Sequence, residues 1–164
     1  MSGITWEILD ERFSYDPDTG ILSVKEVRNS SASYGEEAGW NNGGYRRVSI
    51  NGKHLLVHKV IWALYYKEKP PEYIDHEDGN GLNNRILNLR AATESQNMQN
   101  RGTPSHNTSG HKGVHWHKGT GRWTVKVSYN KRHYYGGYYV EIGRAIEEAT
   151  KLRTQLHGAY ANHN

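Results

Sequence analysis

The stretch "YIDHEDGNGLNNRILNLRAATESQN", residues 73–97, decides both the fold and the chemistry that this chain can support. Its first part sets Asp75 directly before His76, after the apolar residue Ile74. Neighbouring side chains on a strand point to opposite faces, unless the chain turns at once. Gly79 and Gly81 predict such a turn, so a carboxylate and an imidazole can be held at one site.

The second part of the stretch predicts a short strand and then a helix. Residues 87–91, "LNLRA", fit a strand, and Thr93 with Gln96 three residues later forms a capping box. The helix is therefore expected to begin near Glu94 and to carry Asn97 on its second turn. If this helix packs against the first strand, Asp75 and Asn97 can both supply oxygen ligands to one cation.

These residue types favour a metal-dependent hydrolytic site. Mg²⁺ suits a site with few protein ligands, several waters and a phosphate, and Mn²⁺ is the alternative ion. His76 can take a proton from water, because an imidazole is largely neutral at cellular pH. The simpler interpretation is that Asp75 caps a strand end and that His76 lies on the surface.

The stretch resembles the HNH nuclease motif, the ββα-metal site of phage and intron-encoded homing endonucleases. The resemblance covers roughly residues 10–101. It implies that Asp75 and Asn97 are metal ligands, that His76 is the general base, and that Asn88 holds the loop and orients the histidine. An Asn at the last ligand position, where some relatives have His, leaves the choice of metal open.

Two arginines in the motif are candidate DNA contacts. Arg85 follows the "NN" pair at 83–84, and Arg90 follows the central Leu-Asn-Leu run. Each could reach a DNA phosphate or remain a solvated charge, and both alternatives stay open. Asn84 fits a hydrogen bond within the loop, and His58 receives no chemical role.

The region before the motif is predicted to hold short strands, turns and one helix. "SYDPDTGIL" at 14–22 and "GYRRVSINGKHLLVHK" at 44–59 fit β-hairpins, the second with a type I′ turn at Asn51-Gly52. "HKVIWALYYKEKPP" at 58–71 continues as a helix of about ten residues that the two prolines end. Residues 1–101 thus form the expected nuclease domain.

A second domain is predicted after a linker. Residues 102–110, "GTPSHNTSG", have no apolar residue and fit a linker. Residues 111–164 then contain three strand-like runs, "KGVHWH", "RWTVKVSY" and "RHYYGGYYV", and an amphipathic helix from 141 to 158. The predicted class is α+β: an HNH domain preceded by hairpins and a helix, then a three-stranded antiparallel sheet with one helix.

The second domain resembles the AP2 DNA-binding module over about residues 109–164. The resemblance is carried by Gly113-Val114, Gly121, Trp123, Gly137, the "EEA" at 147–149 and the closing "HGAYANHN". It implies that the exposed sheet face enters the major groove, and strand alternation selects the same face. The DNA-binding residues predicted for this domain are Lys112, His115, His117, Arg122, Lys126, Ser128, His133 and Tyr135.

Composition limits the other classes of protein to which this chain could belong. The 164 residues carry a net charge of +4, and residues 101–164 hold ten of the basic side chains and three of the acidic ones. This basic excess fits either a polyanionic partner such as nucleic acid or a merely soluble basic surface, and charge alone leaves both open. The chain contains no Cys, which rules out disulfides and thiolate zinc sites. No apolar run is long enough for a membrane span, and "MSGITWEILDERF" does not fit a signal peptide.

The predicted function is therefore a metal-dependent DNA endonuclease of the homing type, which nicks or cleaves double-stranded DNA at specific sites. The alternative is an AP2-type sequence-specific DNA-binding protein with an inactive HNH portion. A cytoplasmic location is expected, in the bacterial host if a phage encodes the protein. The sequence leaves open whether it acts as a monomer or a dimer.

Overall fold

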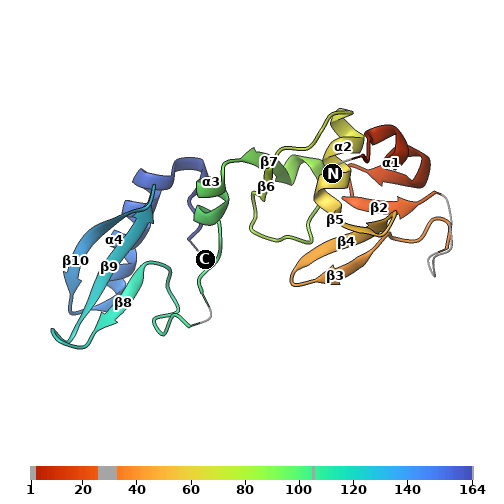
Figure 1. Cartoon of the computed structure of the whole chain (residues 1–164). Coiled ribbons are helices and arrows are strands. Elements are labelled where there is room, and N and C mark those ends of the chain that lie inside the picture. The colour runs from red at the N-terminus through yellow and green to blue at the C-terminus, as the bar shows by residue number, and fades with distance from the viewer. Residues whose placement is uncertain (1–2, 26–32, 105, 164) are drawn as a thin grey trace. The chain divides into compact units, whose positions relative to one another are not determined.

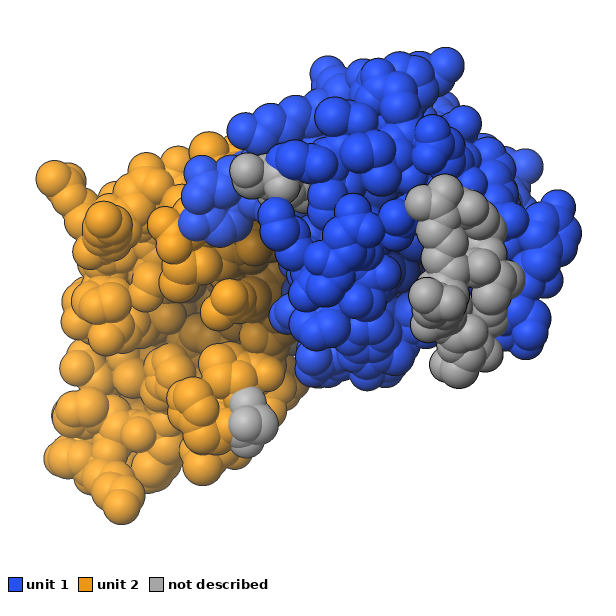
Figure 2. All heavy atoms as spheres, turned by 45° about the vertical axis from the view of Figure 1, so that its right-hand side comes forward, with its two compact units in different colours: residues 1–92 blue, residues 93–164 orange. Residues whose placement is uncertain are grey.

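The chain forms two compact units. The structure is a computed structural model and describes residues 3–25, 33–104 and 106–163. Contacts within the chain separate residues 1–92, here unit 1, from residues 93–164, here unit 2 (Figure 2). Small antiparallel sheets and a few helices confirm the predicted α+β class (Figure 1).

Unit 1 begins with a helix that was not predicted, since the single helix expected before the motif lies much later in the chain. α1 (Trp6–Arg12) spans two turns and buries Leu9 completely. It packs against a later helix, α2 (Val57–Tyr66). A helix this short depends on tertiary packing, which its own periodicity does not reveal.

The first predicted hairpin is confirmed as β1 (Phe13–Asp16) and β2 (Ile21–Val24). The Asp16 carboxylate shapes its turn by accepting hydrogen bonds from the backbone N–H groups of Asp18 and Thr19, at 2.9 and 3.4 Å. Gly20 closes the turn at φ +79°, a conformation that glycine adopts without steric cost.

The second predicted hairpin is part of a three-stranded sheet with the order β3-β4-β5. Its strands are β3 (Trp40–Asn42), β4 (Tyr45–Ile50) and β5 (Lys53–Leu56). Asn51 and Gly52 have φ of 50° and 74°, as a type I′ turn requires. The predicted helix follows at once as α2, which buries Val57, Val60 and Ile61 in the core of unit 1.

The first part of the stretch 73–97 forms a hairpin of β6 (Tyr73–His76) and β7 (Leu89–Ala92). In its register Asp75 pairs with Arg90, and His76 pairs with Leu89. β7 begins later than predicted, because the 3₁₀ turn η1 (Ile86–Asn88) precedes it.

Unit 2 begins with the predicted capped helix, α3 (Glu94–Gln99). The capping box is confirmed. The Thr93 hydroxyl accepts from the Gln96 N–H at 3.2 Å, and the Gln96 side chain accepts from the Thr93 N–H at 2.8 Å. The predicted linker, residues 102–110, continues within unit 2, where the Ser109 hydroxyl donates to the Val114 carbonyl at 2.7 Å.

The rest of unit 2 has the predicted three antiparallel strands and one helix. β8 (Val114–His117), β9 (Arg122–Tyr129) and β10 (Arg132–Tyr139) pair in the order β10-β9-β8. α4 (Ile142–His157) lies across one face of the sheet (Figure 1), and the 3₁₀ turn η2 (Gly158–Tyr160) follows. The core is small, built on Val114, Val125, Ala145 and Ala149.

Candidate active site and DNA-binding surface

Asp75 and His76 lie at the end of β6, where the chain turns. Their side chains are only 3% and 4% exposed. The turn begins at once, since the Gly79 N–H donates to the His76 carbonyl at 2.9 Å. Two adjacent ionisable side chains are thus buried at a strand end, a placement that is costly without polar partners.

The imidazole of His76 forms a hydrogen bond with Asn84 and packs against the rings of His58 and Tyr45. Its Nε2 lies 3.1 Å from Oδ1 of Asn84, which is also buried. The ring centroids of His58 and Tyr45 lie 5.0 and 5.8 Å from that of His76. Burial lowers the pKa of His76, although the hydrogen bond to Asn84 opposes this shift. His76 is therefore neutral at pH 7.

The hydrogen bond with Asn84 also selects the tautomer of His76. The amide Oδ1 only accepts hydrogen bonds, so Nε2 must carry the proton. Nδ1 is then the unprotonated nitrogen, the one that can accept a proton as a base. From the sequence, Asn84 was predicted only to form a hydrogen bond within the loop, yet its side chain contacts His76.

His58, which the sequence left without a role, lies on α2 beside His76. Its side chain is 5% exposed, and burial, together with the charge of His76, lowers its pKa to about 3. Neutral His58 thus packs edge-on against His76, with ring planes at 79°.

The pKa of His58 makes stability depend on pH. In the unfolded chain His58 titrates near 6.5, so protons favour unfolding between that value and about 3. Above pH 6.5 His58 is neutral in both states and does not lower the free energy of unfolding. On acidification below pH 6.5 the free energy of unfolding falls by about 1.4 kcal/mol per pH unit. We expect His58→Leu to show a shallower fall in unfolding free energy than wild type between pH 6 and 4, measured by urea unfolding. Parallel pH profiles would contradict the assignment.

Asn88 holds the loop that follows His76. Its Oδ1 accepts from the Asp78 N–H at 3.0 Å, and its Nδ2 donates to Oδ1 of Asp78 at 3.0 Å and to the Asn83 carbonyl at 2.8 Å. These bonds tie the two ends of the loop together. They agree with the loop-holding part of the role that the HNH resemblance implies for Asn88.

The N-terminal hairpin supports the same loop, a contribution that sequence analysis missed. The Tyr15 hydroxyl donates to the Asn84 carbonyl at 3.0 Å. Gly20 lies so close that an added Cβ would be 2.5 Å from the backbone nitrogen of Arg85. The backbone of Asn84 is therefore held in place by residues more than sixty positions away.

Arg90 pairs with the proposed ligand Asp75. Its Nε and one terminal nitrogen both lie 2.8 Å from Oδ2 of Asp75, and its other terminal nitrogen is 3.7 Å from Glu77. The cross-strand register places the two side chains together. Of the two predicted DNA contacts in the motif, Arg85 is exposed, whereas Arg90 is partly buried and bound to Asp75.

Asn97 lies on α3 and so belongs to unit 2, whereas Asp75, His76 and Asn88 belong to unit 1. The shared metal site of Asp75 and Asn97 remains a prediction. No cluster of three His, Cys, Asp or Glu side chains suited to a metal occurs in residues 3–25, 33–104 and 106–163. A metal here would rest on one carboxylate and one amide.

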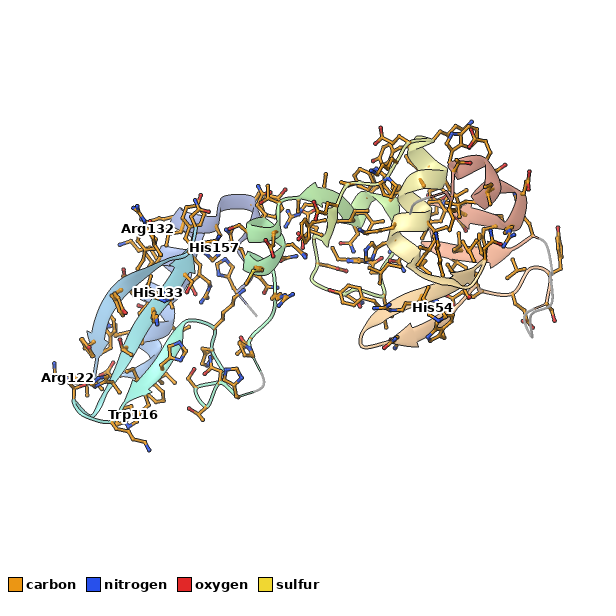
Figure 3. The ribbon with its side chains drawn as sticks, in the orientation of Figure 1. His54, Trp116, Arg122, Arg132, His133 and His157 are labelled. Carbon is orange, nitrogen blue, oxygen red and sulfur yellow. The ribbon has the colours of Figure 1, made fainter. Side chains whose placement is uncertain are left out.

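Unit 2 presents a polar face on the side of its sheet away from α4. Cross-strand pairs on this face are His117 with Arg122, Lys126 with Tyr135, and Ser128 with His133. Ser128 and His133 are hydrogen-bonded at 2.9 Å. Figure 3 labels Arg122 and His133 on these strands. The outer sheet face, which also carries His115, thus contains seven of the eight DNA-binding residues predicted for this unit.

Lys112, the eighth, has a different environment. Its ammonium group donates to the Gln99 carbonyl at 2.6 Å and also to the carbonyl of Arg101. Burial, with a smaller effect of the Arg153 charge, lowers its pKa to about 8. The described contacts of Lys112 therefore lie with the backbone after α3.

Sequence comparisons identify the family of the chain. The profile described as HNH endonuclease matches residues 55–99, the segment that holds Asp75, His76, Asn88 and Asn97. Protein 3.8 of Escherichia phage T7 is 37% identical over 107 residues, which are 63% of this chain and 86% of that protein. The chain belongs to the HNH endonucleases. This HNH endonuclease is thus an enzyme of the nuclease class, and residues 73–97 lie within the matched segment.

Two further relatives match this HNH endonuclease over shorter parts. The DNA endonuclease I-HmuI of Bacillus phage SP01 is 36% identical over 64 residues, 35% of this chain and 36% of that protein. YosQ of Bacillus subtilis (strain 168), named as a candidate HNH homing endonuclease of the SPbeta prophage, is 26% identical over 81 residues, 49% of this chain and 47% of that protein. The chain therefore spans less than half of these two relatives.

No solved structure matches this HNH endonuclease significantly. In the part of the chain that the structure describes, no helix is both long and apolar enough to cross a membrane.

Proposed function

We propose that this protein is a metal-dependent DNA endonuclease of the homing type, which nicks double-stranded DNA with His76 as general base. The observation that carries the proposal is the buried pair Asp75 and His76 at the end of β6, inside the segment that matches the HNH profile. The names of I-HmuI and YosQ support DNA as substrate and the homing type.

The donor set of the proposed metal site fits Mg²⁺ or Mn²⁺. Asp75 offers a carboxylate and Asn97 an amide, and hard divalent cations take such oxygen ligands. Arg90 binds Asp75 through Oδ2 and so orients the carboxylate. When bound, the ion would stabilise negative charge on the scissile phosphate and on the leaving oxygen.

His76 would take the proton from the attacking water. Asn84 keeps the proton on Nε2, so Nδ1 is the basic nitrogen. The lowered pKa keeps the ring neutral at physiological pH, the protonation state that a base needs. Asn88, by tying the loop ends together, would keep the Asn84–His76 contact in place.

The outer sheet face of unit 2 would bind the DNA, as the AP2 resemblance implies. Arg122 and Lys126 can contact phosphates, and exposed His115, His117, Ser128, His133 and Tyr135 can contact base edges or sugars. Cationic contacts of this kind release counterions, so affinity should fall steeply with salt. One HNH site cuts one strand, so nicking is the expected outcome for a monomer.

The experiment that tests this function is nicking of supercoiled plasmid and of genomic DNA from the source. We expect relaxed circles or defined nicks with Mg²⁺ or Mn²⁺ and none with EDTA. EDTA removes the ion that Asp75 and Asn97 would hold, and with it the stabilisation of negative charge on the phosphate. Genomic DNA is included because a site-specific enzyme can spare an arbitrary plasmid.

Two results would count against the proposal. Cutting that persists in EDTA would exclude the metal-dependent mechanism. Binding to all DNA substrates without any cutting would instead favour the alternative, an AP2-type DNA-binding protein with an inactive HNH portion.

A further inference from the structure

The helix α3, which carries Asn97, is held at its C-terminal end by side chains from later in unit 2. α3 has six residues, too few to be stable by its own hydrogen bonds. The three successive carbonyls of Gln99, Asn100 and Arg101 each accept a bond from a later side chain. Lys112 donates to the first at 2.6 Å and also to the third, and Asn162 donates to the second at 2.6 Å.

These contacts suit the end of a helix. The last carbonyls of a helix have no intrahelical donor, and a cation near them interacts favourably with the helix dipole. Lys112 supplies both a donor and a charge, and Asn162 supplies a second donor. The other end of α3 also meets the sheet, since the Ser95 hydroxyl lies 3.4 Å from Oδ1 of Asn130 in the β9–β10 turn.

Lys112 is fixed in turn by the long helix of unit 2. Arg153 on α4 is only 3% exposed, and one of its terminal nitrogens donates to the Lys112 carbonyl. A chain of contacts thus runs from α4 through Arg153 and Lys112 to the end of α3. It places Asn97 on a helix that is anchored to the same module whose outer sheet face would bind DNA.

We propose that Lys112 and Asn162 are positioning residues for Asn97: they anchor α3 to the DNA-binding module and so fix the amide ligand of the metal. This inference rests on the proposed function. Asn97 lies two residues before Gln99, so movement of the helix end displaces its side chain. Mg²⁺ requires near-ideal octahedral geometry, so such a displacement weakens metal binding.

The test compares Lys112→Met and Asn162→Ala with wild type by two readouts. Hydrogen–deuterium exchange of residues 94–101 reports whether the anchor holds α3. Mn²⁺ titration in the presence of DNA, followed by electron paramagnetic resonance and by nicking rate, reports the ligand set. At saturating DNA we expect faster exchange and an approximately tenfold higher Mn²⁺ requirement in both variants, about 1.4 kcal/mol. Lys112→Arg should restore part of the affinity.

The control is Lys151→Met, which removes the same charge from an exposed position on α4. It should leave both the exchange of α3 and the Mn²⁺ requirement unchanged. Unchanged exchange in Lys112→Met and Asn162→Ala would overturn the inference. Faster exchange with an unchanged Mn²⁺ requirement would also overturn it, since the contacts would then be structural only. A different result would refute the proposed function instead. In that case wild-type protein neither binds Mn²⁺ nor nicks DNA, while exchange of α3 is still faster in the two variants than in wild type.

Discussion

Replacement of His76 by Ala is expected to slow DNA nicking by about 10²- to 10⁴-fold, the range that a positioned general base contributes. The ring is 4% exposed, its pKa is lowered by burial, and Asn84 selects the tautomer in which Nδ1 is basic. These features favour a base at neutral pH. Because burial lowers the pKa of His76, nicking by wild type should persist below the pH at which an exposed histidine becomes protonated, and should fall only on further acidification.

The measurement is the single-turnover nicking rate at saturating metal, with DNA affinity measured separately in EDTA. Affinity should change little, because His76 is buried. His54→Ala is the control, since His54 is an exposed histidine on β5 of the same unit (Figure 3). If His76→Ala nicks within about threefold of His54→Ala, His76 is not the base.

Gly20→Ala is expected to destabilise unit 1 and to slow nicking, although Gly20 lies far from His76 in the sequence. Gly20 has φ +79°, and a Cβ there would lie 2.5 Å from the Arg85 nitrogen and 2.8 Å from the Asn84 carbonyl carbon. The left-handed conformation costs a non-glycine residue roughly 1–2 kcal/mol. The forced backbone shift adds roughly 1–3 kcal/mol. Because Asn84 orients His76, the shift should also slow nicking by about tenfold or more.

A matched control separates the backbone conformation from the clash. Gly43 has φ +62°, and nothing lies within 4 Å of an added Cβ. Gly43→Ala should therefore lose only roughly 1–2 kcal/mol and keep its nicking rate. Urea unfolding gives the difference in free energy between the two variants. Equal unfolding midpoints, or equal nicking rates, would show that the hairpin does not support the site.

Features that depend on neighbouring residues could be predicted from the sequence. The Asn51-Gly52 turn, the capping box of Thr93 and Gln96, and the strands of unit 2 all follow from local patterns, and the structure contains each of them. The pairing of Arg90 with Asp75 could also have been found. It follows from the hairpin register once His76 is placed opposite Leu89.

The surroundings of His76 could not be predicted in the same way. His58 comes from α2 and Tyr45 from β4, and only the packed core of unit 1 brings their rings to His76. α1 escaped prediction because its single fully buried residue, Leu9, leaves no periodic pattern. Lys112 was predicted from the sequence as a DNA contact, and only the folded backbone brings its ammonium group to two carbonyl acceptors.

The division of the chain between β7 and α3 has a consequence for how such proteins exchange parts by recombination. Asn97, the last residue of the predicted HNH motif, lies beyond that division, in the same unit as the outer sheet face. A crossover at residues 102–110 would give a hybrid whose α3 depends on its new partner to supply donors equivalent to Lys112 and Asn162. A crossover at 92–93 would transfer α3 together with Lys112 and Asn162, so hybrids joined there should keep the contacts that hold the end of this helix.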